Sequence, residues 1–97
     1  MDFAVNSLRV ESITPEKAAE YLQHNYAHNR RLRKHHVDFL ANEMRGGRFM
    51  PTAEIHLMFR NGEPVLVNGQ HTCAAIIKYG KPVLVTLRKT LTSEAGQ

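Results

Sequence analysis

The stretch from residue 53 to residue 79 constrains the fold more than any other part of the chain. Apolar and polar residues alternate over 53–60, which predicts a strand with one face toward a core. Asn61-Gly62 is the favoured two-residue hairpin turn, so 64–67 is predicted to be the return strand. The apolar run ends abruptly at Asn68-Gly69, and a helical pattern then continues to about Lys78. The sequence therefore predicts a hairpin whose second strand leads through a glycine corner into a helix.

This corner has the properties of an anion site. The first N–H groups of a helix have no partner inside the helix, and the helix dipole adds partial positive charge there. A phosphate or a carboxylate can bind at such a point. We expect Gly69 to let a ligand approach the backbone closely, because glycine has no Cβ.

The other elements follow from shorter patterns. Residues 3–10 predict a strand, Thr14-Pro15 predicts the start of a helix that ends near Asn25, and Val83 to Leu87 predicts a closing strand. A second helix is predicted from about Leu32 to Arg45, with one apolar face and a stop at Gly46-Gly47. That face comprises Leu32, His36, Val37, Leu40, Ala41 and Met44. Gly80 is predicted to end the third helix in the left-handed conformation, and this helix is expected to turn Cys73, Ile76 and Ile77 inward.

Together these elements predict an α+β domain with the order β-α-α-β-β-α-β, in which three helices pack on a small mixed sheet. Residues 1–90 are expected to form this single domain, and residues 91–97 a flexible tail, with fraying from Thr90 onward.

The composition of the chain limits the classes of partner that it is expected to bind. The net charge of +4 and the isoelectric point near 9.6 favour anionic partners such as nucleotides, nucleic acid or an acidic protein surface. No apolar run is long enough to span a membrane, so no membrane partner is expected. A single cysteine excludes an internal disulfide and favours the reducing cytoplasm.

The corner and the blocks before it carry a family resemblance. The stretch 68–75, Asn-Gly-Gln-His-Thr-Cys-Ala-Ala, resembles the Asp-Gly-Gln-His-Arg-Leu-Ala-Ala box of the ParB/sulfiredoxin superfamily. Residues 13–16, the pair Asn29-Arg30 and the pattern over 37–47 resemble the same proteins in the same order. The resemblance covers about residues 10–88 and is closest to small phage and prophage ParB-like proteins.

The resemblance implies a ParB/sulfiredoxin-like fold and a nucleotide pocket. In this superfamily the glycine corner and the following helix hold nucleotide phosphates, from CTP in ParB or ATP in sulfiredoxin, for which magnesium is a possible companion. Carried over to this sequence, the phosphate corner comprises Gly69, Gln70, His71 and Thr72, with Asn29 and Arg30 facing it. The guanidinium of Arg30 suits phosphate oxygens.

Two departures bear on function. Thr72 stands where the family has its phosphate-binding arginine, and Asn68 where it has an aspartate. A charge-assisted hydrogen bond contributes about 1.5–3 kcal/mol, so the loss of the arginine is expected to weaken phosphate binding about ten- to a hundredfold. Gln70 stands at the position of the sulfiredoxin cysteine, and Cys73 is expected to be an inert core thiol, so sulfiredoxin chemistry is excluded.

Histidines and basic residues complete the candidate groups. His24 and His28 are four residues apart and His35-His36 follow, but no carboxylate or cysteine completes a recognisable ligand set, so no metal site is predicted. We expect His36 to be semi-buried and His35 solvated. His71 is a candidate general base, although a phosphate contact or a structural role is favoured. Five further residues form a predicted basic surface, either a solvated face or an anion-binding surface beside the pocket: Arg31, Arg33, Lys34, Arg45 and Arg48.

Three functions are compatible with these residues. The first is a phage-type, ParB-like nucleotide-binding module without turnover or with slow hydrolysis, in a regulatory or DNA-related role. The second is a degenerate member that acts by contact with a macromolecule, for example a phage-encoded inhibitor of a host defence (CRISPR-type) or replication enzyme in the host cytoplasm. The third, a nuclease or nucleotide-dependent phosphotransferase, is disfavoured because no paired carboxylates stand near the corner to hold a catalytic metal.

Overall fold

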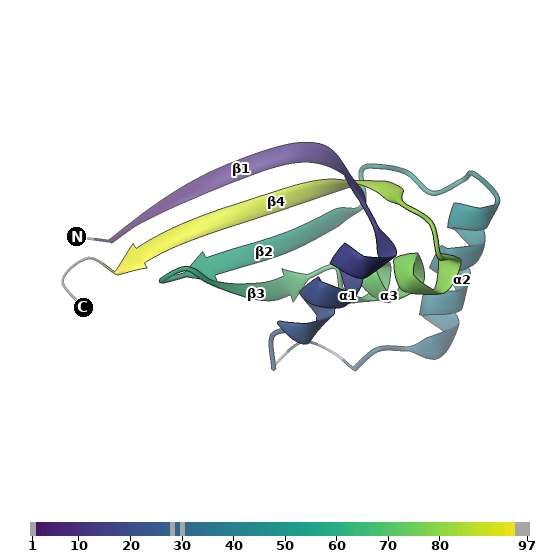
Figure 1. Cartoon of the computed structure of the whole chain (residues 1–97), viewed down its shortest axis with the longest axis horizontal. Helices are drawn as coiled ribbons and strands as arrows, with labels where there is room; N and C mark the ends of the chain where they lie inside the picture. The colour runs from purple at the N-terminus through teal and green to yellow at the C-terminus, as the bar shows by residue number, and fades with distance from the viewer. Residues whose placement is uncertain (1, 28, 30, 95–97) are drawn as a thin grey trace.

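The computed structural model describes residues 2–27, 29 and 31–94. The elements, in chain order, are β1 (Asp2–Ile13), α1 (Pro15–Gln23), α2 (Lys34–Arg45), β2 (Glu54–Arg60), β3 (Glu63–Asn68), α3 (Gln70–Tyr79) and β4 (Val83–Glu94). Three helices and a four-stranded mixed sheet in the order β-α-α-β-β-α-β confirm the predicted α+β class and layout (Figure 1).

The strands lie in the order β1-β4-β2-β3. β4 is antiparallel to β1 and parallel to β2, while β2 and β3 form the antiparallel hairpin. The hairpin turn has positive φ at both Asn61 and Gly62, as its sequence predicts. The long strands β1 and β4 run far beyond the helices, which cover only one end of the sheet (Figure 1).

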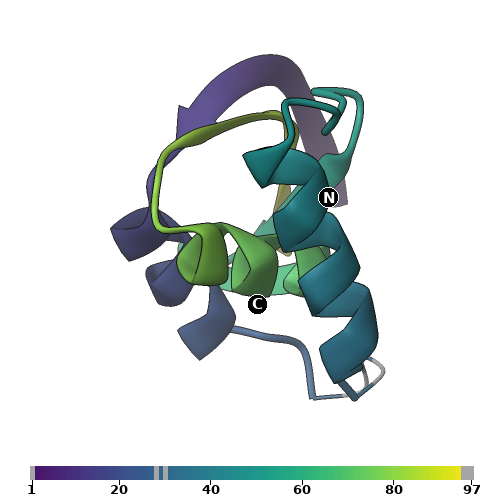
Figure 2. The ribbon, with the colours of Figure 1, turned by 90° about the vertical axis from the view of Figure 1, so that its right-hand side faces the viewer.

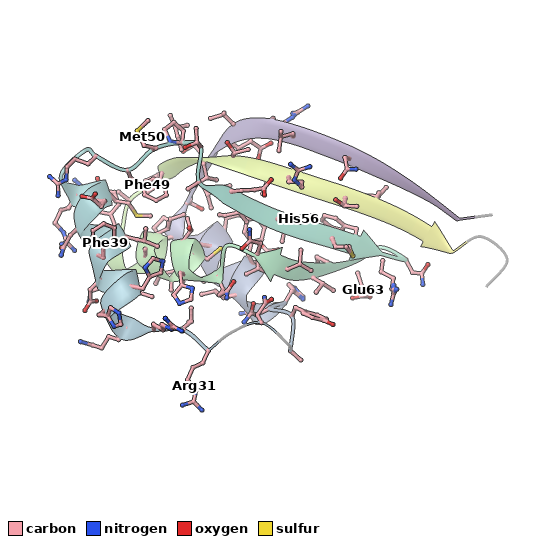
Figure 3. All side chains as sticks on the ribbon, turned by 180° about the vertical axis from the view of Figure 1, so that it is seen from behind. Arg31, Phe39, Phe49, Met50, His56 and Glu63 are labelled. Atoms are coloured by element: carbon pink, nitrogen blue, oxygen red, sulfur yellow. The ribbon has the colours of Figure 1, made fainter. Side chains whose placement is uncertain are left out.

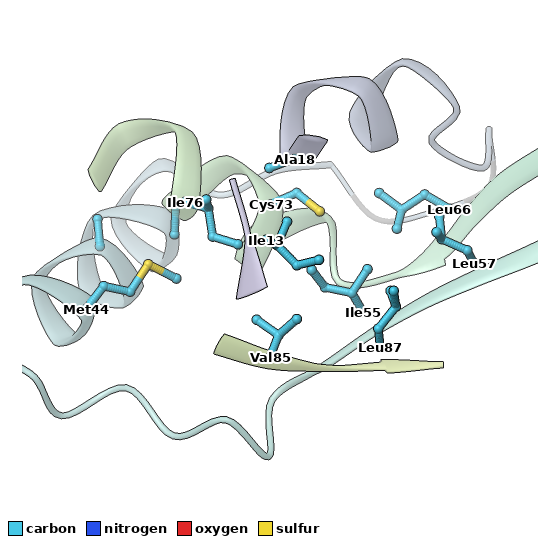
Figure 4. Packing of buried hydrophobic residues seen from close by; sticks show 12 residues of the cluster. Ile13, Ala18, Met44, Ile55, Leu57, Leu66, Cys73, Ile76, Val85 and Leu87 are labelled. Carbon is cyan, nitrogen blue, oxygen red and sulfur yellow. The ribbon is translucent and has the colours of Figure 1, made fainter. Parts of the chain in front are cut away.

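The helices meet one face of the sheet. Figure 2 shows α3 between α1 and α2, and both contact it. The core lies where α3 and its neighbours meet the covered face, and the strands contribute its larger side chains (Figure 4). These are Ile13, Ile55, Leu57, Leu66, Val85 and Leu87, packed against Ala18, Met44, Cys73 and Ile76 from the helices. The alternation predicted for 53–60 is thus confirmed, because Ile55 and Leu57 are buried on one face.

The helix ends also follow the sequence. Thr14 caps α1, accepting a hydrogen bond of 3.1 Å at Oγ1 from the N–H of Lys17, and Pro15 opens the helix. Gly80 ends α3 with φ of +84°, as predicted. Two helical predictions are wrong. Leu32 lies before α2, which begins at Lys34, and Ile77 is 41% exposed rather than buried.

The outer strands are longer than predicted. β1 continues to the buried Ile13 instead of ending at Val10, and β4 continues to Glu94 instead of ending at Leu87. Residues 91–94 of the predicted tail therefore lie in a strand, and 95–97 lie outside the described residues. β4 lies between β1 and β2, so hydrogen bonds on both sides support its polar C-terminal half despite the weak apolar pattern.

Candidate functional site

The corner after β3 opens into a cleft of about 530 Å³ between the start of α3 and the start of α2. The cleft is lined by Arg33, His35, His36, Leu40, Glu54, Asn68, Gly69, Gln70, His71 and Thr72. The strand-to-helix corner predicted from the sequence is therefore part of a cavity. All four residues assigned to the corner line it.

Gly69 is required by packing against β2. Its φ is +100°, a conformation that glycine adopts without strain. A Cβ at this position would lie 2.9 Å from the Cα of Ile55 and 3.0 Å from the carbonyl oxygen of Glu54. The missing side chain thus makes room for the backbone of β2. The sequence-based expectation that it makes room for a ligand gains no support from this geometry.

The first turn of α3 presents donors to the cleft. The N–H of Cys73 makes the first bond of the helix, 2.9 Å to the carbonyl of Gly69. The N–H groups of His71 and Thr72 precede it and have no acceptor inside the helix. Gly69 has no side chain to cap them. Partial positive charge from these groups and from the helix dipole therefore lies at the cleft.

Thr72, at which the resemblance places an arginine, is only 8% exposed. Its hydroxyl has no hydrogen-bond partner among the residues that the structure describes. No buried side-chain nitrogen or oxygen of the described residues lacks a partner, so this hydroxyl remains accessible to solvent at the cleft. The Thr72 hydroxyl can therefore donate a hydrogen bond to a ligand in the cleft.

His71 fastens the two walls of the cleft together. Its Nε2 accepts a hydrogen bond of 3.0 Å from the backbone N–H of Arg33, and its ring meets that of His36 edge to face, with centroids 4.9 Å apart. Burial, reinforced by the charges of His36 and Arg33, lowers the pKa of His71. His71 is therefore held neutral with its proton on Nδ1, because Nε2 must accept. His36 is exposed, so the prediction that it would be semi-buried is wrong.

Arg33 is the arginine that the structure brings to the cleft. Its guanidinium has no ion-pair partner in the described part of the chain, whereas the neighbouring Lys34 lies 3.6 Å from Asp38. Arg30, which the resemblance assigns to the pocket, lies outside the described residues. Asn29 does not line the cleft. Its Nδ2 donates to the carbonyl of Leu66 at 2.9 Å and to Oδ1 of Asn25 at 2.7 Å, fastening the segment after α1 to β3.

The predicted basic residues lie in different places. Arg33 and Lys34 stand at the start of α2, and Arg31 projects away from the body of the molecule in Figure 3. Arg45 stands at the other end of α2, about 17 Å along the helix from Lys34. Arg48 follows it and pairs with Glu43 at 2.5 Å. The cleft is therefore flanked by part of this set only.

Six lining residues were not among the predicted pocket residues: Arg33, which was predicted only for the basic surface, and His35, His36, Leu40, Glu54 and Asn68. α2 has no short-range relation to the corner, and only the packing of α2 against α3 brings its first turns there. Glu54 adds a carboxylate, but Arg88 holds this group through a 2.5 Å contact between Nε and Oε1. Its repulsion of an anion in the cleft is thereby reduced.

The described residues offer few candidates for a catalytic group or a metal ligand. Burial raises the pKa of the Cys73 thiol to about 12, so it stays protonated and inert, as predicted. No group of three or more histidine, cysteine or acidic side chains positioned for a metal occurs among the described residues, and His28 lies outside them. None of the described helices combines the length and apolar character needed to cross a membrane.

The chain was compared with protein families and with curated proteins. No protein-family model matches this chain, and no curated protein matches it. The resemblance to the ParB/sulfiredoxin superfamily remains a prediction from the blocks around residues 13–16, 29–47 and 68–75.

Proposed function

We propose that the chain is a ParB-like module that binds the phosphate groups of a nucleotide, or a similar anion, in the cleft at the start of α3. One observation carries the proposal. The uncapped N–H groups of His71 and Thr72, the unpartnered Thr72 hydroxyl and the guanidinium of Arg33 line the same cleft. Two kinds of neutral donor and one cation around one space form a suitable environment for phosphate.

The size of the cleft supports a nucleotide rather than a lone ion. Its volume of about 530 Å³ falls within the range of about 300–1,000 Å³ that is usual for small-molecule sites. His35, His36 and Leu40 form a wall of imidazole and apolar surface on α2, opposite the phosphate corner. A base or sugar can lie against such a wall while the phosphates contact α3.

Binding without rapid turnover fits the same residues. Nε2 of His71 already accepts from Arg33, and the carboxylate of Glu54 is held by Arg88. A general base needs an available lone pair within reach of the proton that it removes. The proposal is therefore a regulatory or DNA-related binding module in the reducing cytoplasm of a host cell, with CTP or ATP, and magnesium where the nucleotide carries it, as the ligands to test first.

The test is thermal shift and calorimetry of the full chain with CTP, ATP, ADP and GTP, each with and without magnesium. We expect saturable binding of at least one nucleotide. Arg33→Ala should weaken it about ten- to a hundredfold, because a charge-assisted hydrogen bond is worth about 1.5–3 kcal/mol. Thr72→Val should weaken it about tenfold through loss of the hydroxyl, while the fold stays intact, since the hydroxyl has no partner in the protein.

Arg45→Ala is the matched control, because this substitution also removes one arginine charge but at the opposite end of α2. Equal weakening by Arg45→Ala and Arg33→Ala would mean that only net charge matters and would contradict a site at the cleft. The absence of binding to every nucleotide and to inorganic pyrophosphate would overturn the proposal. If a macromolecular partner then co-purified in a stoichiometric amount, that result would favour the alternative function, in which the protein acts by contact with a macromolecule.

A further inference from the structure

The two edges of the sheet differ in how they are protected. At the β3 edge, Leu66 exchanges backbone hydrogen bonds with the segment after α1, donating to His24 at 2.7 Å and accepting from Tyr26 at 2.9 Å. β3 also contains Pro64, and the β2–β3 register shifts at His56/Leu57. Covering segments, prolines and bulges are among the usual means of preventing an edge strand from pairing with another chain.

The β1 edge has none of these features. β1 pairs with β4 over twelve consecutive positions, from Asp2–Glu94 to Ile13–Val83, without a register shift. The strand contains neither proline nor glycine. Within the described residues β4 is its sole partner, and no described segment lies beyond β1 in Figure 1. Its outer backbone groups form a long, regular and unpaired edge.

The side chains of β1 make this edge self-complementary. Leu8 and Val10 are 57% and 58% exposed on the face of the sheet that carries no helices, and Leu84 of β4, which pairs with Ser12 and is diagonal to Val10, is 54% exposed on that face. Arg9 and Glu11 alternate with them on the other face, and neither has an ion-pair partner in the described chain. An antiparallel copy centred on Val10 would place each Arg9 opposite Glu11 of the other copy.

Charge selects this register over its neighbours. Moving the centre of symmetry one residue toward the N-terminus would place Arg9 opposite Arg9, and moving it one residue toward the C-terminus would place Glu11 opposite Glu11. A parallel, in-register pairing would create both repulsions at once. Directly opposed like charges destabilise a strand pair, whereas opposite charges stabilise it. The register centred on Val10 forms two ion pairs by symmetry and no repulsion between these residues.

We infer that β1 is a homodimer edge, on which a second copy of this chain adds its own β1 antiparallel about a two-fold axis at Val10. The pairing joins two four-stranded sheets into one of eight strands. It brings Val10 of each copy into contact and extends the apolar strip of Val10 and Leu84 across the axis. The nucleotide cleft lies at the opposite side of the sheet order, beside β3, so the dimer does not depend on the proposed function.

Sedimentation equilibrium of the full chain at low ionic strength tests this inference. We expect a dimer whose dissociation constant rises with salt, because the ion pairs are solvent-accessible. Arg9→Glu and Glu11→Arg each replace two attractions by two repulsions, and each should raise the dissociation constant at least tenfold. Circular dichroism establishes that the variants are folded. Lys81→Glu, in the exposed turn before β4, is the control for net charge and should leave the dimer unchanged.

Complementation gives the decisive result. The Arg9→Glu chain carries two acidic residues and the Glu11→Arg chain two basic residues, so an equimolar mixture should form a heterodimer although each variant alone is monomeric. The double variant Arg9→Glu/Glu11→Arg should recover the homodimer. A chain that remains monomeric at all concentrations, or a dimer that both single variants leave intact, overturns the inference.

Discussion

The backbone N–H of Arg33 donates a hydrogen bond of 3.0 Å to Nε2 of His71, although the two residues are 38 positions apart in the chain. This bond joins the segment before α2 to the first turn of α3 and brings Arg33 to the cleft beside the corner at Gly69. The histidine of the corner thus acts on the cleft by positioning the arginine.

Replacement of His71 should loosen this junction. We expect His71→Ala to expose the Arg33 N–H to solvent exchange and to lower the unfolding free energy by about 1 kcal/mol, the usual contribution of one hydrogen bond. Hydrogen exchange resolved at Arg33 measures the first effect. His71→Gln, whose side-chain oxygen can accept in place of Nε2, should restore part of the protection. Unchanged exchange at Arg33 in His71→Ala would show that the bond is not formed in solution.

The same bond predicts a pH dependence of stability. Burial, with His36 and Arg33 nearby, lowers the pKa of His71 in the folded state below its ordinary value of 6.5. The unfolded chain therefore binds a proton at a higher pH than the folded chain does. The contribution to stability is complete above about pH 6.5 and is lost as the pH falls toward the folded pKa.

Denaturant unfolding at a series of pH values checks this effect. The wild-type chain should lose more stability than His71→Gln between pH 7 and about pH 5, since glutamine does not titrate. Identical pH profiles for the two chains would contradict the assignment to His71.

Gly69 offers a test of the packing at the corner. Gly69→Ala should lower the unfolding free energy by about 2–4 kcal/mol, because alanine is strained at positive φ and its Cβ would collide with the backbone of β2 at Ile55. Gly80→Ala is the matched control: φ is +84° there, and nothing lies within 4 Å of the added Cβ. It should cost only about 1–2 kcal/mol, the usual cost of the left-handed conformation for a residue with a Cβ. Equal losses in denaturant unfolding would show that β2 yields to the added methyl group.

The thiol of Cys73 should report global unfolding. It is fully buried and its pKa is raised to about 12, so a disulfide reagent should modify it only as fast as the chain opens. Stopped-flow mixing with such a reagent, in increasing denaturant, measures this rate. A fast reaction under native conditions, comparable with that of an unfolded peptide, would contradict the burial of this side chain.

Local patterns were sufficient for much of the fold. The alternation over 53–60, the Asn61-Gly62 turn, the Thr14 cap and the Gly80 stop each depend on residues close together in the chain. The structure agrees with these four predictions because hydrophobic periodicity and helix capping depend on residues within one or two turns of backbone. The same patterns predicted the order of all seven elements.

The predictions that failed depend on distant partners. The C-terminal half of β4 has the composition of a tail, yet Thr90 is 8% exposed, and its hydroxyl contacts His56 at 2.8 Å and Asn6 at 2.7 Å. No local pattern identifies a strand that neighbours on both sides complete. Sequence spacing likewise could not show that Asn29 binds β3 while Arg33 lines the cleft.

The sequence by itself determined the type and the order of the elements and where the glycine corner falls, because those choices follow from the backbone and from side chains a few positions away. Tertiary structure alone decided which surfaces meet: it set α2 beside the corner, turned the missing Cβ of Gly69 toward Ile55, and left the edge of β1 open. These outcomes depend on packing between segments far apart in the chain, and the interaction of any one segment with its immediate neighbours carries no information about them.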